Sequence, residues 1–258
     1  MGSFGGSSSA NERKHSGNPV LRSSVYEKAM SAAGLSSGSE VMTLDGAVNK
    51  IGMLLFIVVA TSLYTYTTTI NGNGGLGLTM LGAFAAFILA IITSFSPQRA
   101  PITAPLYAAF EGLFLGGISA YFELRYPGII FQSIGLTMGI FIAMLAIYKF
   151  RIISVTNNFR LGVIAATAGV AIFYFGMMIL QMFGIYLPSF GGGLFGIIIS
   201  LFVIGIASMN LVLDFDFIEQ GVEAEAPKFM EWYGAFGLMV TLVWLYVEVL
   251  RLFARSRD

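Results

Sequence analysis

The chain has 258 residues, of which 56% are hydrophobic and 11% are charged, and its 14 lysines and arginines balance its 14 acidic residues. A composition this apolar excludes an ordinary soluble domain, which needs more charge on its surface. The net charge of zero excludes nucleic-acid binding, because that function depends on a basic surface. The composition is typical of an integral membrane protein.

A polar segment precedes the first apolar run. Residues 1–46 are rich in glycine and serine and poor in large apolar side chains, so we predict a disordered tail over this range. The transmembrane domain is expected to occupy residues 47–258. Thr43 and Asp45 are both suitable caps for the start of the first helix.

Seven apolar runs follow the tail, and each is close to the 20 or so residues that cross the roughly 30 Å hydrocarbon core as a helix. None of them alternates with a period of two, which disfavours a β-barrel. We therefore predict an all-α, polytopic membrane protein with a seven-helix transmembrane bundle. The predicted spans are Ile51–Thr69, Leu76–Phe95, Ala104–Phe122, Ile129–Phe150, Leu161–Phe183, Gly193–Leu213 and Tyr233–Phe253.

Lysines and arginines near the ends of the spans indicate the orientation of the bundle. With a cytoplasmic amino terminus and seven crossings, the inner positions are Lys50, Arg99, Lys149, Arg151, Arg160 and Lys228, and the outer ones are Arg125, Arg251, Arg255 and Arg257. This bias favours a cytoplasmic amino terminus. The three arginines at the carboxyl end favour an even number of crossings instead, so the side of the carboxyl terminus stays open.

The residue inventory argues against an enzyme. There is no cysteine, and the only histidine, His15, lies in the polar tail, so zinc hydrolase and intramembrane serine protease chemistry lack their histidine. A retinal-type protein needs a lysine within a span, and the five lysines all lie outside the apolar runs or at their edges. We expect neither catalysis nor a resident cofactor.

Two carboxylates lie inside apolar runs, Glu111 in the third and Glu248 in the seventh. A charged side chain at the bilayer centre costs about 2.5–3.5 kcal/mol even on a lenient scale, so such acids usually face protein or water and mark an ion or proton pathway. Glu111 has two interpretations that the sequence does not separate. It lines a pathway, or it forms a buried ion pair with Arg251.

Three short motifs carry a family resemblance. They are the aspartate motif Leu213-Asp-Phe-Asp-Phe-Ile, the aromatic-acid motif Tyr246-Val-Glu-Val-Leu and the pair Glu111-Gly112. Together they closely resemble the Bax inhibitor motif family of membrane proteins, in its bacterial Bax inhibitor-1-like branch, over roughly residues 45 to 255. The resemblance implies a seven-helix fold with a central last helix and a cation leak pathway, with calcium as the ion.

The resemblance also implies a gate made of two acids on the last two helices, which share a proton and close the pore. The residues of this sequence that match the two gate acids are Asp214 and Glu248, with Asp216 as the alternative partner of Glu248. The family usually has aspartate at both positions, whereas this sequence has glutamate at 248. Two close carboxylates in a low-dielectric site titrate as a coupled unit, and when ionised they offer hard oxygen ligands to Ca²⁺.

These features predict a pH-sensitive calcium or cation leak channel. The alternative is a regulatory protein that binds another membrane complex, such as a membrane protease, and a proton-coupled transporter is a third possibility. The expected partners are the lipid bilayer, Ca²⁺, protons and, under the alternative, a membrane protein. The family branch suggests a bacterial inner membrane.

Overall fold

The computed structural model describes residues 40–184 and 193–257, and seven long α-helices account for most of them. All seven are long and apolar enough to cross a membrane, which confirms the predicted all-α bundle. A short 3₁₀ turn, η1 (Pro97–Arg99), precedes the third of these helices. The helices are α2 (Leu44–Ile70), α3 (Gly75–Phe95), α4 (Ala100–Arg125), α5 (Ile129–Lys149), α6 (Asn157–Met182), α7 (Gly193–Glu223) and α8 (Met230–Arg255).

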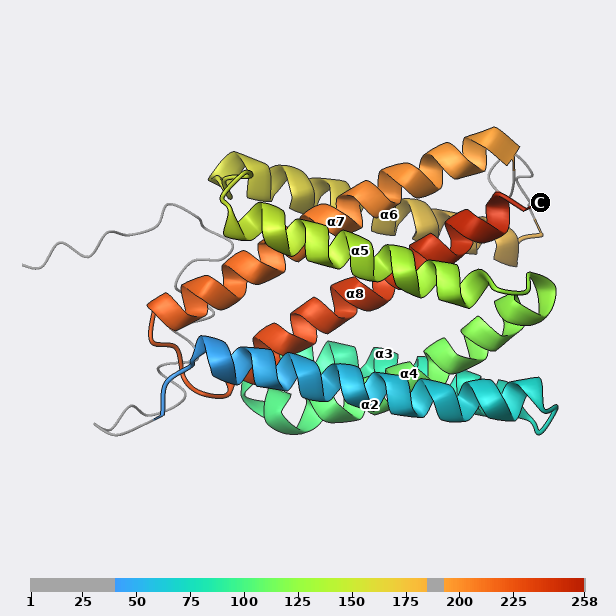
Figure 1. Cartoon of the computed structure of the whole chain (residues 1–258), viewed down its shortest axis with the longest axis horizontal. Helices are drawn as coiled ribbons and strands as arrows, with labels where there is room; N and C mark the ends of the chain where they lie inside the picture. The colour runs from blue at the N-terminus through green and yellow to red at the C-terminus, as the bar shows by residue number, and fades with distance from the viewer. Residues whose placement is uncertain (1–39, 185–192, 258) are drawn as a thin grey trace, which may run out of the picture.

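Successive helices run in opposite directions, so the start of α2 and the end of α8 lie at opposite ends of the bundle (Figure 1). The number of membrane-crossing helices among the described residues is therefore odd, whereas the carboxyl-terminal arginines favour an even number. These arginines bind protein groups instead. Arg251 pairs with Glu248, Arg255 donates to the Gly196 carbonyl and the Ser200 hydroxyl, and Arg257 donates to the Pro127 carbonyl and the Gln132 amide oxygen.

The last helix, α8, is the central one, as the family resemblance implied (Figure 1). Phe236, Met239 and Val243 pack against α2 and α4 on one side of it. Leu238, Leu242 and Leu245 pack against α7 on another side. Because apolar residues surround α8 on several sides, it is buried as a core helix rather than as a surface one.

Helix α4 approaches its neighbours closely at glycines. A Cβ atom on Gly116 would lie 2.1 Å from the Ser62 carbonyl oxygen of α2, and one on Gly112 would lie 2.5 Å from the Val58 carbonyl oxygen. Both distances are far inside van der Waals contact. Because glycine has no Cβ atom, the backbones of α4 and α2 can approach this closely.

The amino-terminal boundary of the folded domain lies before residue 47. Thr43 caps α2 by accepting a hydrogen bond of 3.0 Å from the Gly46 amide, so α2 begins at Leu44. Upstream of the cap, Val41 forms an isolated β-bridge with Pro227, and the Met42 amide donates to the Ala226 carbonyl. Residues 40–46 therefore pack on the folded bundle and are not part of the disordered tail that the sequence predicts. The rest of the predicted tail lies outside the described residues.

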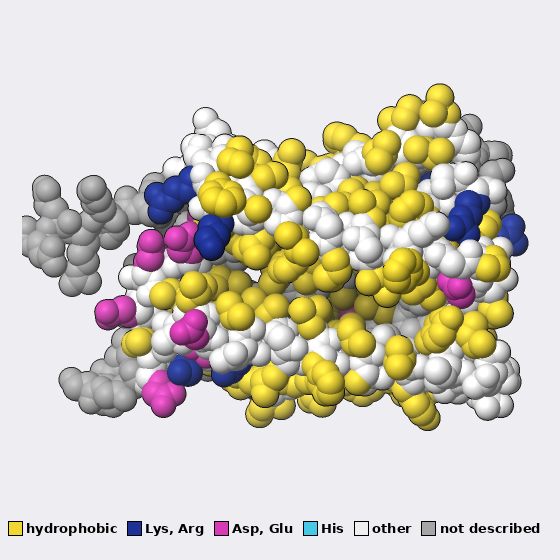
Figure 2. All heavy atoms as spheres, in the orientation of Figure 1, with side chains coloured by type: hydrophobic (Ala, Val, Ile, Leu, Met, Phe, Trp, Pro, Cys, Tyr) yellow, Lys and Arg dark blue, Asp and Glu magenta, His cyan; other side chains and the backbone are white. Residues whose placement is uncertain are grey.

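Large apolar side chains cover the sides of the bundle, as a surface in contact with hydrocarbon requires (Figure 2). Helix α6 is the least buried of the seven spans, with 11% of its most apolar window buried. Its few buried positions include Arg160, Val163 and Val170. Polar contacts therefore have a large part in holding α6 to the rest of the protein.

Candidate functional site

One face of α8 presents polar groups to α6 and α7. Thr241 and Glu248 are seven residues apart and therefore lie on the same face of a helix with 3.6 residues per turn. Gly237 lies one turn before Thr241 on this face. Of these groups, Glu248 is the most isolated from water, with 1% of its surface exposed.

Glu248 uses both of its carboxylate oxygens. The Tyr174 hydroxyl of α6 donates a hydrogen bond of 3.0 Å to Oε2, and Nη1 of Arg251 donates one of 2.9 Å to Oε1. The Arg251 guanidinium also lies 5.2 Å from the centre of the Tyr174 ring, within reach of a cation–π interaction. A phenol, a carboxylate and a guanidinium thus connect α6 to α8.

Asp214 of α7 lies against the same face of α8, nearer its start. Its Oδ1 would be 3.7 Å from a Cβ atom on Gly237, and its side chain lies within hydrogen-bonding reach of the Thr241 hydroxyl. Its Oδ2 is buried without a hydrogen-bond partner. A buried carboxylate oxygen without a partner is costly, so it marks a place where a proton, a water molecule or a cation can be accommodated.

The structure does not bring the two predicted gate acids together. No hydrogen bond or ion pair joins Asp214 to Glu248 among residues 40–184 and 193–257. Helix α7 continues to Glu223, about 13 Å beyond Asp214, whereas Glu248 lies about 27 Å from the start of α8 at Met230. The two helices are antiparallel, so this difference puts the two acids at different depths in the bundle.

The alternative gate residue, Asp216, has other partners. It forms an ion pair with Arg160 of α6 and accepts a hydrogen bond of 2.7 Å from the Gln220 amide. The guanidinium of Arg160 is nearly buried, with 6% of its side chain exposed. Asp216 therefore anchors α6 to α7 near the end of the bundle and does not approach Glu248.

Glu111 is buried in α4, with 8% of its surface exposed, and interacts with the Tyr107 hydroxyl one turn earlier. The ion pair with Arg251, one of the two interpretations of Glu111, is not formed, because Arg251 binds Glu248, a residue one turn away on its own helix. The predicted Ca²⁺ ligands, Asp214 and Glu248, do not converge on a common point. Within the described part of the chain, no group of three or more acidic or histidine side chains is arranged to hold a metal ion.

Helix α6 carries a row of polar side chains at intervals of seven residues: Arg160, Thr167 and Tyr174. Each of the three has a partner on a neighbouring helix, namely Asp216, Asn210 and Glu248 in that order. The Asn210 amide donates to the Thr167 hydroxyl at 2.8 Å. We call these three pairs the polar ladder.

The polar ladder extends through much of the bilayer. Seven residues of helix rise about 10 Å, so its three pairs span about 21 Å along α6. Asp214 lies along α7 between Asp216 and Asn210, the α7 members of the first two pairs. We did not predict the ladder, although the heptad spacing of Arg160, Thr167 and Tyr174 is visible in the sequence. Which helix those side chains would face is a property of the folded bundle.

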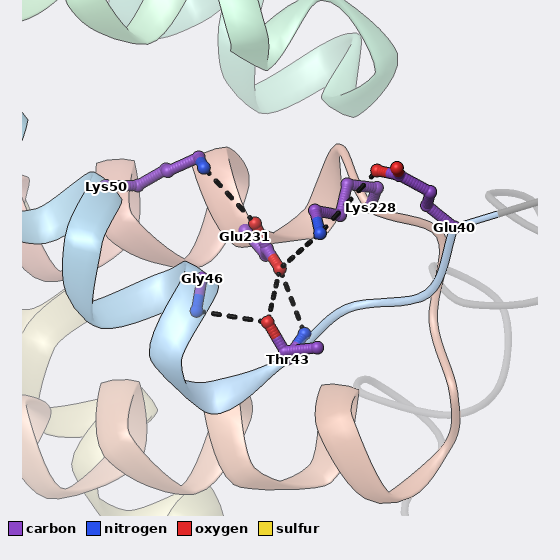
Figure 3. Close-up of polar contacts among 6 residues, drawn as sticks. All are labelled: Glu40, Thr43, Gly46, Lys50, Lys228 and Glu231. Atoms are coloured by element: carbon purple, nitrogen blue, oxygen red, sulfur yellow. Dashed lines mark hydrogen bonds and ion pairs between the residues drawn. The ribbon is translucent and has the colours of Figure 1, made fainter.

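A second buried polar centre lies where α8 begins (Figure 3). Glu231 is fully buried, and its Oε1 accepts hydrogen bonds of 3.0 Å from the amide and from the hydroxyl of Thr43. Lys50 and Lys228 approach the same carboxylate at 3.6 and 3.7 Å. A Cβ atom on Gly46 would lie 2.0 Å from Oε1 of Glu231, so only glycine fits there.

The sequence does not indicate this centre, because Glu231 is one of several acids between the last two apolar runs. Its burial depends on residues 40–46 folding back over the start of α8. The centre ties the amino-terminal end of α2 to the junction between α7 and α8. Its carboxylate is matched by two ammonium groups, which is the requirement for burying a charge.

The fold and these contacts define a polytopic membrane protein with a central last helix and ionisable groups buried among its spans. The family model described as "Bax inhibitor 1 like" matches residues 10–258, so the chain belongs to the Bax inhibitor 1 like family. The comparisons with the curated proteins and with the solved structures returned no match.

Proposed function

We propose that this protein is a cation leak pathway that passes Ca²⁺ in a proton-dependent way, with the route running along the polar ladder between α6, α7 and α8. The observation that carries the proposal is the ladder itself, three polar pairs about 10 Å apart. Two acids lie along this route, Asp214 of α7 and Glu248 of α8, and Glu248 is itself a member of the ladder. Polar and ionisable groups are rare inside spans and mark ion pathways when they occur.

The chemistry of these groups suits a hard cation. Carboxylate, amide and hydroxyl oxygens are the ligands that Ca²⁺ prefers, and Asp214, Asn210 and Thr167 supply one of each kind. A pathway for a leak needs such groups at intervals rather than a tight cage, because a cation that binds too strongly does not leave. The ladder pairs are about 10 Å apart, so they offer such groups at intervals.

The contacts of Glu248 support a closed state and a role for protons. Tyr174 and Arg251 occupy both oxygens of this carboxylate, and the three side chains fix α6 against α8. The ion pair requires an ionised Glu248. Arg251 lies on α8 together with Glu248, so the hydrogen bond that joins α6 to this carboxyl group is the one from Tyr174, and an ionised carboxylate accepts it more strongly than a neutral carboxyl group does. The proposed gate therefore opens as the pH falls, and it uses Glu248 with Tyr174 and Arg251 instead of a direct pair of acids.

We further propose a bacterial inner membrane as the location, with the Leu44 end of the bundle in the cytoplasm. Lys50, Lys149 and Lys228 all lie at that end, and cytoplasmic loops carry the excess of lysine and arginine. The acids and lysines of the Glu231 centre lie at the same end (Figure 3).

The test is Ca²⁺ flux into liposomes that contain only the purified protein and a trapped calcium indicator. We expect flux to rise as the pH is lowered from about 8 to about 5. Flux equal to that of empty liposomes at every pH would reject the channel. It would favour the alternative function, a regulatory protein that binds another membrane complex, because such a protein passes no ions by itself.

A further inference from the structure

A groove opens on the side of the bundle between α2 and α5 (Figure 2). Both helices pack on α4 and α8, whose residues form the floor of the groove. Its volume is about 490 Å³, which is in the range of pockets that hold one small molecule. We call this feature the lateral groove.

The walls of the lateral groove are almost entirely apolar. Val58 and Leu63 of α2 face Ile134 of α5 across it, and Leu242 and Val243 of α8 lie at its floor. Water does not fill an apolar cavity favourably. Since α2 and α5 both cross the bilayer, the molecules in contact with this opening are lipids.

The length of the lateral groove matches one leaflet of the bilayer. Along α2 it extends from Leu55 to Tyr66, eleven residues or about 16 Å. That is roughly half of the 30 Å hydrocarbon core. Tyr66 lies near the end of α2, so the groove runs from the membrane surface to the middle of the bilayer, which is the depth that one acyl chain occupies.

Charges of both signs lie at the outer end of the lateral groove, Glu123 in its lining and Arg257 beside it. Arg257 lies there, where its guanidinium donates hydrogen bonds of 3.0 Å to the Pro127 carbonyl and 2.8 Å to the Gln132 amide oxygen. The Glu123 carboxylate, which lines the groove, accepts hydrogen bonds from the amides of Gly128 and Ile130. Guanidinium groups bind phosphate well, so Arg257 is complementary to the phosphate of a phospholipid headgroup.

We propose that the lateral groove binds one acyl chain of a membrane phospholipid, whose phosphate group lies at Arg257. The occupant comes from the leaflet on the side of the carboxyl terminus. It fills the space between α2 and α5 that protein side chains leave open. This site is on the α2 and α5 side of α8 and is separate from the polar ladder, so it does not depend on the proposed ion pathway.

The test uses phosphatidylglycerol with a photoreactive diazirine near the methyl end of one acyl chain. The purified protein is irradiated in bilayers of this lipid, and the adducts are located by peptide mass spectrometry. We expect adducts at Val58 and Leu242, in the depth of the groove, at several times the yield at Phe56, which is 74% exposed on the outside of α2. Adducts confined to outward residues such as Phe56 would overturn the proposal.

Two matched variants test the groove and the rim. Ile134→Trp fills the mouth of the groove and is expected to remove the adducts at Leu242. Ile142→Trp, on the same helix but outside the groove, should leave them unchanged. Arg257→Gln should abolish the preference of the groove adducts for phosphatidylglycerol over phosphatidylcholine. An unchanged preference would overturn the placement of the phosphate at Arg257.

A water-filled groove is the remaining alternative, and the absence of cysteine from the chain allows a direct check. Val243→Cys places a single thiol at the floor. We expect a charged, water-soluble thiol reagent to leave it unmodified under conditions that modify a cysteine placed at the exposed Ser256. Equal modification of the two thiols would show water in the groove and contradict a bound acyl chain.

Discussion

Tyr174 of α6 donates a hydrogen bond of 3.0 Å to Glu248 of α8, and Arg251 lies next to both of them. This contact joins the least buried of the seven spans to the central helix. A helix with a small buried surface can separate from its neighbours at a lower cost than one held by a large apolar interface. The relationship between Tyr174 and Glu248 is therefore the most direct place to test the proposed gate.

Glu248→Gln should make Ca²⁺ flux independent of pH. Glutamine keeps the shape of the side chain and one acceptor for Tyr174, but it does not titrate and does not pair with Arg251 as an ion. We expect flux at neutral pH to approach the value that the unchanged protein reaches at low pH. The measurement is flux against pH in liposomes. Glu219→Gln, at an exposed acid on α7, is the matched control and should retain the pH response. A normal pH response in Glu248→Gln would place the gate elsewhere, with Asp214 the next acid to test.

Tyr174→Phe removes one hydroxyl and keeps the aromatic ring beside Arg251. Hydrogen bonds between helices in membranes contribute about 0.6 kcal/mol on average and at most about 1.7 kcal/mol. We therefore expect a small loss of thermal stability together with a clear rise in flux at neutral pH, because α6 loses one of its contacts to α8. Tyr121→Phe, at a side chain that is 63% exposed, should change neither quantity. Flux that stays at the original level would show that the hydroxyl does not hold the closed state.

Asp216→Asn should destabilise the protein strongly, because it leaves the nearly buried Arg160 guanidinium without its ion-pair partner. The loss of one member of a buried pair costs about 3–5 kcal/mol. Replacing both residues, with Arg160→Met added, should recover part of that loss. Thermal unfolding in detergent of the two single variants and the double variant measures the coupling.

Glu111→Gln and Arg251→Gln provide the comparison for that cycle. A pair between these two residues is one of the two interpretations that the sequence allows for Glu111, but Arg251 pairs with Glu248. Their effects on stability should therefore add within about 0.5 kcal/mol. A coupling as large as the one expected for Arg160 and Asp216 would mean that Glu111 and Arg251 meet after all.

Glu231→Gln should loosen the contact between the start of α2 and the start of α8. The substitution removes the charge that Lys50 and Lys228 share, and these lysines are 24% and 43% exposed, so water compensates part of the loss. We expect a destabilisation of about 1–3 kcal/mol. Hydrogen exchange should speed up in residues 40–46 and stay unchanged in α6. Glu223→Gln, at an exposed acid near the end of α7, is the control, and equal exchange in the two variants would contradict the role of Glu231.

The seven spans were predictable because the bilayer imposes a length on every apolar run, whatever its neighbours. Most spans begin and end within about four residues of the predicted positions, but α2 begins at Leu44 instead of Ile51, and the largest difference is at α7. Its apolar run ends at Leu213, but the helix continues to Glu223. The continuation carries Asp216 and Glu219, whose contacts with Arg160 and Tyr148 allow charged residues to remain helical at the end of the bundle.

That extension also explains why Asp214 and Glu248 do not pair. The sequence by itself determined that Glu111, Asp214 and Glu248 lie within or at the end of apolar segments, because hydrophobicity along the chain is a local property. The partners of these acids depend on how far α7 extends, where α8 turns back and which face of α6 meets them. Those are tertiary properties. Only the folded bundle decided that Glu248 binds Tyr174 and Arg251. The depth of Glu248 in the bundle depends on where the connection after α7 ends and α8 begins, and the sequence does not show this.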